Sequence, residues 1–149
     1  MNALMTSRER VNAAISHKEP DRVPLDIGGG ASSSIVIEGY EKLKEQMGVN
    51  SETKVMSKIF RIARMDTSIS QQLGSDCQPL MIKPPSNWNP PESEPGTFID
   101  IWGIKWKQVY YNRDCYYYEA VTHPLSEAEI DDLDRYPWPD PLDTDSPMA

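Results

Sequence analysis

Asp26 and three nearby glycines form the first group of residues whose types and order could do chemistry. They follow the short apolar run 23–27, and serines come next in the chain. Barrel enzymes carry their chemistry at the carboxyl ends of strands, and glycine lets a ligand approach the backbone closely. The pattern predicts a substrate-binding site made of Asp26, Gly28, Gly29 and Gly30. It assigns no catalytic residue.

A flexible turn with a solvated aspartate is the alternative interpretation of the same run, and it requires no ligand. A dinucleotide-binding fingerprint is excluded. The G-x-G-x-x-G spacing needs a third glycine at the position that Ser33 occupies.

The two histidines and two cysteines are candidate zinc ligands: His17, Cys77, Cys115 and His123. Their spacing is irregular and contains no C-x-x-C or H-x-x-x-H pair. His17 falls near the end of a predicted helix, where a partial positive charge is favourable. Structural roles are therefore favoured, no metal site is predicted, and the cysteines are expected to be free thiols in a reducing compartment.

Aromatic side chains are concentrated between positions 102 and 118. They could line a wall for a flat ligand, but on a hairpin such residues more often form cross-strand packing pairs. Packing is the favoured interpretation, and a face that covers the mouth of a barrel is the alternative. The residues are Trp102, Trp106, Tyr110, Tyr116, Tyr117 and Tyr118.

The elements that must position these residues begin with a helix. Thr6 and Glu9 have capping-box spacing, and Pro20 ends the helical pattern. The run 23–27 is typical of a short strand. A second helix is predicted over 37–47, because its apolar residues recur at helical spacing and Gly48 supplies the stop.

The middle of the chain gives weaker signals. The run 54–64 fits a helix or an extended segment. Asp66 is expected to cap a short helix that Gly74 ends, and a strand is predicted over 77–82.

The second half is predicted to begin with a loop, because five prolines between 84 and 95 exclude helix and central strand. Three β-rich runs follow, then a short helix over 127–136 capped by Ser126, with Glu129 at capping-box spacing. The β-rich runs are 97–102, 104–110 and 116–122, with a turn signal at 112–114.

Charge and hydropathy exclude two classes of function. The chain carries a formal charge of −8, and the segment 125–149 alone holds eight acids and one base. A chain without a basic stripe is a poor candidate for nucleic-acid binding. No apolar run approaches the length of a membrane span, and the N-terminus lacks a signal-peptide pattern, so a cytoplasmic location is expected.

Five segments, in this order, resemble the N-terminal part of the uroporphyrinogen decarboxylase superfamily, which includes porphyrinogen decarboxylases and corrinoid-linked methyltransferases. The resemblance implies a (β/α)₈ TIM barrel with added N-terminal helices and a β-hairpin. A full barrel of this kind takes about 250 residues, so 149 residues would supply only the decoration and the first strands. The segments are TSRERVNAAISHKEPDRVPLD, YEKLKEQMG, MDTSISQQLGSDC, DIWGIKW and HPLSEAEIDDLDRYPWPDP.

The resemblance is closer to the methyltransferases than to the true decarboxylases. The decarboxylases carry an arginine-rich MRQAGR segment after the strand that matches 23–27, whereas this chain has Gly28–Ser33 there. They also carry a catalytic aspartate in an FSD run, and the matching positions near Lys83, Pro84 and Pro85 have no acid. Corrinoid-dependent methyl transfer is therefore the activity expected of the parent enzyme.

The fold class predicted is α/β, a partial uroporphyrinogen decarboxylase-like barrel over 1–141 with a disordered tail or truncated linker over 142–149. The resemblance implies zinc and a corrinoid for the parent, with no ligand assignable in this chain. Expected partners are a small-molecule substrate or a corrinoid protein bound through further polypeptide, and self-association through an exposed sheet edge. True porphyrinogen decarboxylation and a small non-catalytic α/β remnant or interaction module are the alternatives.

Overall fold

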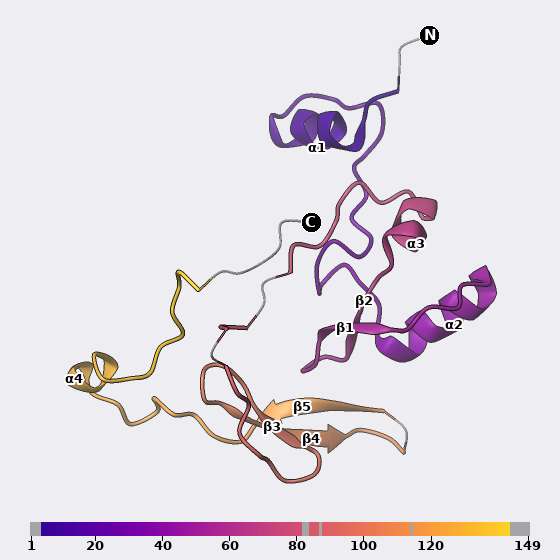
Figure 1. Cartoon of the computed structure of the whole chain (residues 1–149). Helices are drawn as coiled ribbons and strands as arrows, with labels where there is room; N and C mark the ends of the chain where they lie inside the picture. The colour runs from indigo at the N-terminus through magenta and orange to yellow at the C-terminus, as the bar shows by residue number, and fades with distance from the viewer. Residues whose placement is uncertain (1–3, 82–83, 87, 114, 144–149) are drawn as a thin grey trace. The chain divides into compact units, whose positions relative to one another are not determined.

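The computed structural model describes residues 4–81, 84–86, 88–113 and 115–143. It divides into two compact units, Met1–Leu80 and Met81–Ala149 (Figure 1). The described residues contain four helices and two antiparallel sheets. The molecule is thus a small mixed α/β protein.

Helix α1 (Ser7–Ile15) confirms the predicted capping box. The Thr6 hydroxyl accepts a hydrogen bond from the Glu9 amide, and the Glu9 carboxylate accepts one from the Thr6 amide. The helix ends with His17 in the left-handed region, at φ 55°. The His17 and Lys18 amides close the last turn on the Ala14 and Ala13 carbonyls, a Schellman arrangement in which glycine is the usual residue at the His17 position.

Helix α2 (Ile37–Met47) has the predicted bounds, and Gly48 ends it in the left-handed conformation. The ambiguous run 54–64 is a hairpin of β1 (Lys54–Ser57) and β2 (Ile62–Arg64), which lies beside α2 in Figure 1. Val36 forms an isolated antiparallel bridge to Ile62. The chain before α2 therefore runs along the edge of this hairpin.

The core of the first unit lies between α2, β2 and α3 (Thr67–Gln72). Asp66 is the N-cap of α3, as predicted, but its carboxylate bonds to Tyr40 and Ser51 instead of capping the helix. Burial of the Tyr40 ring raises the pKa of its hydroxyl to about 12. The buried apolar residues are Tyr40, Ala63, Met65 and Ile69.

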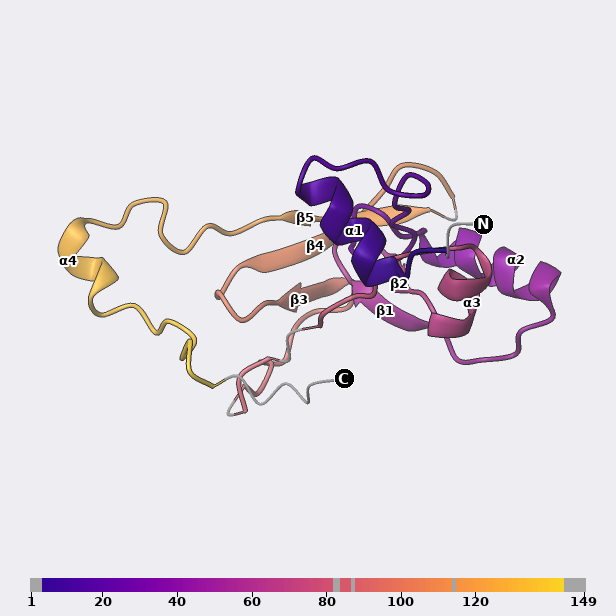
Figure 2. The ribbon, with the colours of Figure 1, turned by 90° about the horizontal axis from the view of Figure 1, so that it is seen from above.

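The second unit is built on a three-stranded sheet in the order β3–β4–β5, which Figure 2 shows from above. These strands are β3 (Thr97–Ile99), β4 (Lys105–Tyr110) and β5 (Tyr116–Ala120). They confirm the three predicted runs with shorter bounds, and the described residues from 84 to 95 form the predicted loop. Residue 114 of the predicted turn lies outside the described residues.

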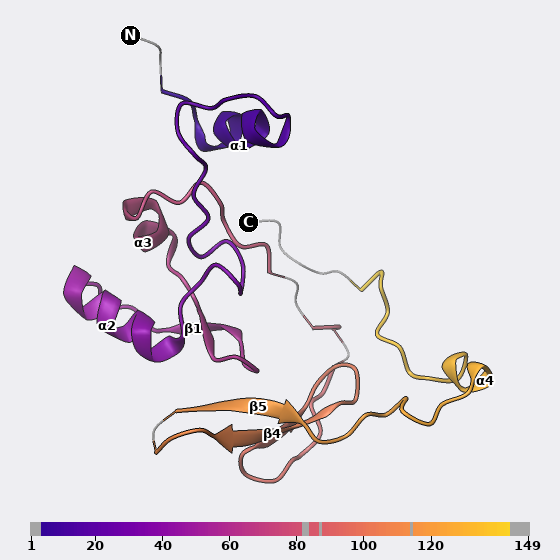
Figure 3. The same ribbon diagram turned by 180° about the vertical axis from the view of Figure 1, so that it is seen from behind.

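Helix α4 (Ile130–Leu133) is shorter than predicted and begins later; Figure 3 shows it after β5, in an otherwise irregular segment. Glu129, not Ser126, is its N-cap, and Asp132 is the third residue of its capping box. Pro124–Glu127 form a turn instead, because the Ser126 amide bonds to the His123 carbonyl. Part of the predicted tail, 144–149, lies outside the described residues.

Two predicted strands are wrong. The run 23–27 joins no sheet, and neither it nor the described part of 77–82 has regular secondary structure. The Leu25 amide bonds to the Asp76 carboxylate, and the Ile27 amide bonds to the Ser75 hydroxyl. Side-chain oxygens therefore accept the hydrogen bonds that these two amides would otherwise donate to a neighbouring strand. Residue 82 lies outside the described residues.

Within the part of the chain that the structure describes, no helix combines the length and apolar character that a bilayer-spanning segment requires.

Candidate functional site

The predicted glycine site is a loop closed on itself. The Gly29 amide donates to Asp26 Oδ1 at 2.8 Å, the Gly28 amide to the Ser33 carbonyl at 2.8 Å, and the Gly30 amide to Ser33 Oγ at 3.0 Å. All three glycine amides are therefore committed within the loop. Asp26 is exposed to solvent, and one of its oxygens already accepts a bond.

Two of the three glycines stand where neighbouring atoms leave no room for a side chain. Gly28 is buried with φ +88°, and a Cβ there would lie 2.9 Å from the Met65 Cβ. A Cβ on Gly29 would lie 2.4 Å from Asp26 Oδ1 and 2.8 Å from the Cys77 Cβ. A Cβ on Gly30 would meet only Ser33 Oγ, at 3.8 Å. Position 30 is the one glycine of the three with room for a side chain.

Cys77 is brought to this loop from about fifty positions along the chain. Burial raises the pKa of its thiol, and the carboxylates of Asp26 and Asp76 raise it further. A thiol with a raised pKa stays protonated at neutral pH and is a weak nucleophile. No sequence signal linked Cys77 to Asp26, because their approach depends on the tertiary fold.

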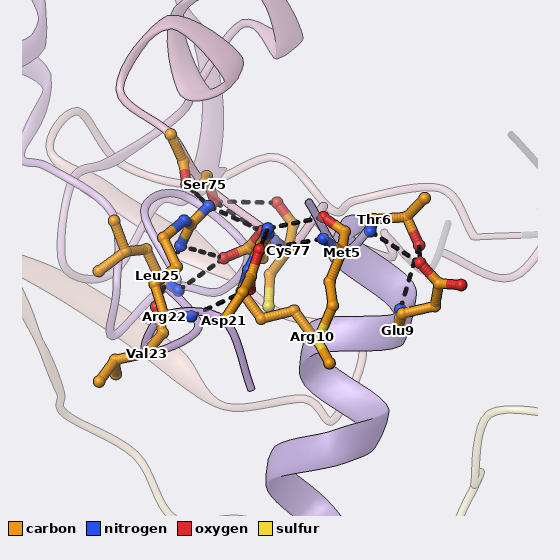
Figure 4. A network of polar contacts seen from close by, with 12 residues as sticks. Met5, Thr6, Glu9, Arg10, Asp21, Arg22, Val23, Leu25, Ser75 and Cys77 are labelled. Carbon is orange, nitrogen blue, oxygen red and sulfur yellow. Dashed lines mark hydrogen bonds and ion pairs between the residues drawn. The ribbon is translucent and has the colours of Figure 1, made fainter. Parts of the chain in front are cut away.

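A network of charged side chains surrounds Arg10 (Figure 4). Arg10, on α1, binds Asp21 through two hydrogen bonds of 2.6 and 2.9 Å and also reaches Asp76. Arg22 binds Asp76 through bonds of 2.7 and 3.0 Å. The Asp76 side chain is fully buried, and the Arg10 side chain is 7% exposed. The network fastens α1 to the segments 21–25 and 74–76.

The carboxylates of this network are held ionised. The Arg10 guanidinium lowers the pKa of Asp21 to about 2. Burial by itself would raise the pKa of Asp76, but the Leu25 amide and the guanidinium groups of Arg22 and Arg10 outweigh it, so that pKa lies well below its ordinary value. The sequence analysis did not predict this network, because paired charges of opposite sign cancel in the net charge.

The aromatic residues of the second unit divide into two groups. Phe98 stacks on Trp106 and meets the edge of Tyr118, and Tyr110 packs across the strands against Tyr116. These contacts confirm the favoured packing interpretation. Trp102 differs, because its ring meets Trp138 from beyond α4 instead of a strand neighbour.

Metal ligation was tested on the four candidate residues and on the acids around them. Among the described residues, no three His, Cys, Asp or Glu side chains gather closely enough to hold a metal ion. His17 ends α1, and His123 lies with Trp102 beside the turn before α4. The residues present do not fit the zinc site that the resemblance implies for a parent enzyme.

Comparisons with protein-family models, with curated proteins and with solved structures returned no match to this chain. The structure thus offers two candidate sites: the glycine loop with Cys77 in the first unit, and the Trp102–Trp138 contact in the second.

Proposed function

We propose that this chain forms the N-terminal part of a cytoplasmic uroporphyrinogen decarboxylase-like barrel enzyme, and that the parent's activity is corrinoid-dependent methyl transfer. The ordered resemblance of five segments supports the proposal. The mixed α/β fold, with helices before and between the first extended runs, is compatible with the opening of such a barrel.

One structural observation carries the proposal. The run 23–27 contacts Asp76, the residue just before the run 77–82, and the resemblance assigns both runs to the first barrel strands. The Asp76 amide donates to the Leu25 carbonyl at 2.7 Å, and the Leu25 amide donates to the Asp76 carboxylate at 2.9 Å. Successive strands of a barrel are neighbours, so a contact of 23–27 with the residue before 77–82 is compatible with the resemblance, while neither run forms a strand within the described residues.

Exposure of the first run supports the same proposal. The side chains of Val23 and Leu25 are 76% and 40% exposed, although a barrel strand buries such residues. Further polypeptide that adds strands beside this run would cover them. At about 25 cal/mol per Å² of apolar surface, burial of these side chains would favour association with such strands.

The charges near the loop favour methyl transfer over decarboxylation. A porphyrinogen carries several carboxylates and needs cationic partners, but the segment 28–34 has no base. Arg10 and Arg22 are engaged with Asp21 and Asp76. The exposed Asp26 and the partly exposed Gly29 and Gly30 would then border a substrate that needs no cluster of arginines. Zinc chemistry would have to come from ligands elsewhere in the parent.

The test is the activity of the complete reading frame that contains this chain. We expect the encoded protein to contain a His-x-Cys pair and a distant cysteine, to hold zinc, and to transfer the methyl group of methylcobalamin to a thiol. Substituting Asp26→Asn should lower the rate, whereas Glu52→Gln, an exposed position outside the loop, should not. Release of carbon dioxide from uroporphyrinogen without methyl transfer would support the true decarboxylase instead.

A non-catalytic α/β module is the second candidate, and the closed core of the first unit favours it. Tyr40 and Ile69 are fully buried there, as in a unit that is stable without further strands. A sharp cooperative melt of the isolated chain, with little binding of a hydrophobic dye, would support this module. Broad melting, dye binding and self-association through a sheet edge would support the barrel proposal.

A further inference from the structure

The second unit contains a hollow of about 260 Å³ lined by aromatic and apolar side chains. Trp102 and Trp138 are 48% and 49% exposed there, although indole rings are usually covered in folded proteins. Tyr136 is the third aromatic residue of the lining. The other lining residues are Ile104, His123, Pro124, Leu125 and Ser126.

The Trp138 ring is inclined to the rings of Trp102 and Tyr136, and the polar side-chain atoms of Tyr136 and Trp138 are already bonded. The planes of Trp102 and Trp138 meet at 65°, with centroids 6.4 Å apart, and those of Tyr136 and Trp138 meet at 55°. The Tyr136 hydroxyl donates to the Trp102 carbonyl, and Trp138 Nε1 donates to the Leu133 carbonyl at 2.8 Å. What the Trp138 and Tyr136 side chains can still offer a ligand is chiefly their π surface.

Carboxylates line two adjoining hollows that share residues with this one. One adjoining hollow shares Tyr136 and includes Glu127 and Asp132; another shares Trp102, Tyr136 and Trp138 and includes Asp140. Asp132 is partly compensated by Arg135, at 3.1 Å. No described lysine or arginine lines any of the three hollows.

The charge of the whole unit has the same sign. The segment 81–149 contains thirteen aspartates and glutamates against five lysines and arginines. Its field therefore concentrates cations and repels anions near the hollow.

We propose that this hollow binds a small organic cation with a methylated ammonium head. Inclined tryptophan and tyrosine rings attract such a head through their π electrons, and the attraction is strongest when the cation sheds its water. A methylated ammonium sheds water easily and brings apolar methyl groups to Ile104 and Leu125. The proposal goes beyond the proposed methyl transfer and does not depend on it.

The decisive experiment compares choline with its uncharged isostere 3,3-dimethylbutan-1-ol, each titrated into the full chain at pH 8 and low salt. All four tryptophans lie in the second unit, so indole fluorescence reports binding there. We expect choline to give a saturable change and to bind at least about fivefold more tightly than the alcohol. Equal binding of the two, or no saturable change with choline, would overturn the proposal.

Variants locate the site. Trp138→Leu should weaken choline binding at least about fivefold, and Asp140→Asn should weaken it about twofold at low salt. Tyr111→Leu removes an aromatic ring that is 66% exposed and outside the hollow, and it should leave binding unchanged. Near-ultraviolet circular dichroism checks that each variant is folded. Unchanged binding by a folded Trp138→Leu chain would place the ligand elsewhere and refute the assignment.

Discussion

The two units of this chain are stabilised by different kinds of interaction. The segment 1–80 balances ten acids with ten bases, whereas 81–149 holds thirteen acids, five bases and eleven of the thirteen aromatic residues. The first unit buries four apolar side chains together with charged Arg10 and Lys44. In the second unit none of the described residues is buried, and its sheet depends on aromatic side chains that pack against one another.

The difference teaches where each unit is vulnerable. A buried ion pair is stable only while both partners stay charged and bonded, so the first unit should respond to pH and to charge removal. Stacked aromatic rings carry no charge to lose, so the second unit should respond to the loss of ring area and ring hydrogen bonds.

Acid should destabilise the first unit selectively. Asp21 has a pKa of about 2, and that of Asp76 is also lowered. The unfolded carboxyls take up protons at higher pH than the folded ones, so the stability from both groups is present above about pH 4 and is lost toward pH 2. Helical circular dichroism during urea unfolding should show this fall, with little change in tryptophan emission.

The control for the acid effect is a chain with Asp21→Asn and Asp76→Asn together. This variant should be less stable than the native chain at neutral pH, and it should lose less stability between pH 5 and pH 2. A native chain equally stable at pH 7 and pH 3 would contradict the role given to the buried carboxylates.

Substituting Asp76→Asn alone should cost about 3 kcal/mol of unfolding free energy, because it leaves the guanidinium groups of Arg10 and Arg22 without their shared buried partner. Urea unfolding followed by helical circular dichroism measures the cost. Asp26→Asn is the matched control, since Asp26 is exposed and an amide oxygen can still accept the Gly29 hydrogen bond. Equal losses in both variants would mean that burial of the charge is unimportant.

Gly28→Ala should cost about 2 kcal/mol, because the new Cβ would crowd Met65 at a positive φ. Gly30→Ala should change stability by less than about 0.5 kcal/mol, since its Cβ has room. Thermal melting compares the two variants. If Gly30→Ala proves as damaging as Gly28→Ala, the loop is constrained by more than packing.

Trp106→Phe should weaken the second unit by about 1–2 kcal/mol. The substitution removes ring area next to Phe98 and the hydrogen bond from the indole nitrogen to Asp100, at 2.8 Å. Near-ultraviolet circular dichroism during urea unfolding measures the change, and the helical signal of the first unit should persist. A simultaneous loss of both signals would show that the units unfold as one.

His17→Gly should stabilise the first unit by about 0.5–1 kcal/mol, because glycine adopts the left-handed conformation at this helix end without strain. Lys18→Gly, one position on, lacks this benefit and serves as the control. Differential scanning calorimetry at pH 7 compares the melting temperatures of the two variants. A lower melting temperature for His17→Gly would indicate that the histidine side chain contributes contacts of its own.

Local sequence patterns predicted the local structure well. Thr6 and Glu9 predicted the start of α1, and apolar spacing with Gly48 predicted both ends of α2, because these signals act within a few residues. The strand predicted over 23–27 was wrong for the opposite reason. An apolar run becomes a strand only when another backbone pairs along it, and here the Leu25 and Ile27 amides donate to the side chains of Asp76 and Ser75.

The candidate sites show the same division. The sequence by itself determined where the glycines and aromatic residues stand, how acidic the second half is, and where most helices and strands begin. Only the tertiary structure decided that Cys77 lies against Gly29, that Asp76 joins two arginines, and that Trp102 meets Trp138. Contacts between residues far apart in the chain depend on how all the intervening segments pack, and no short window of sequence contains that information.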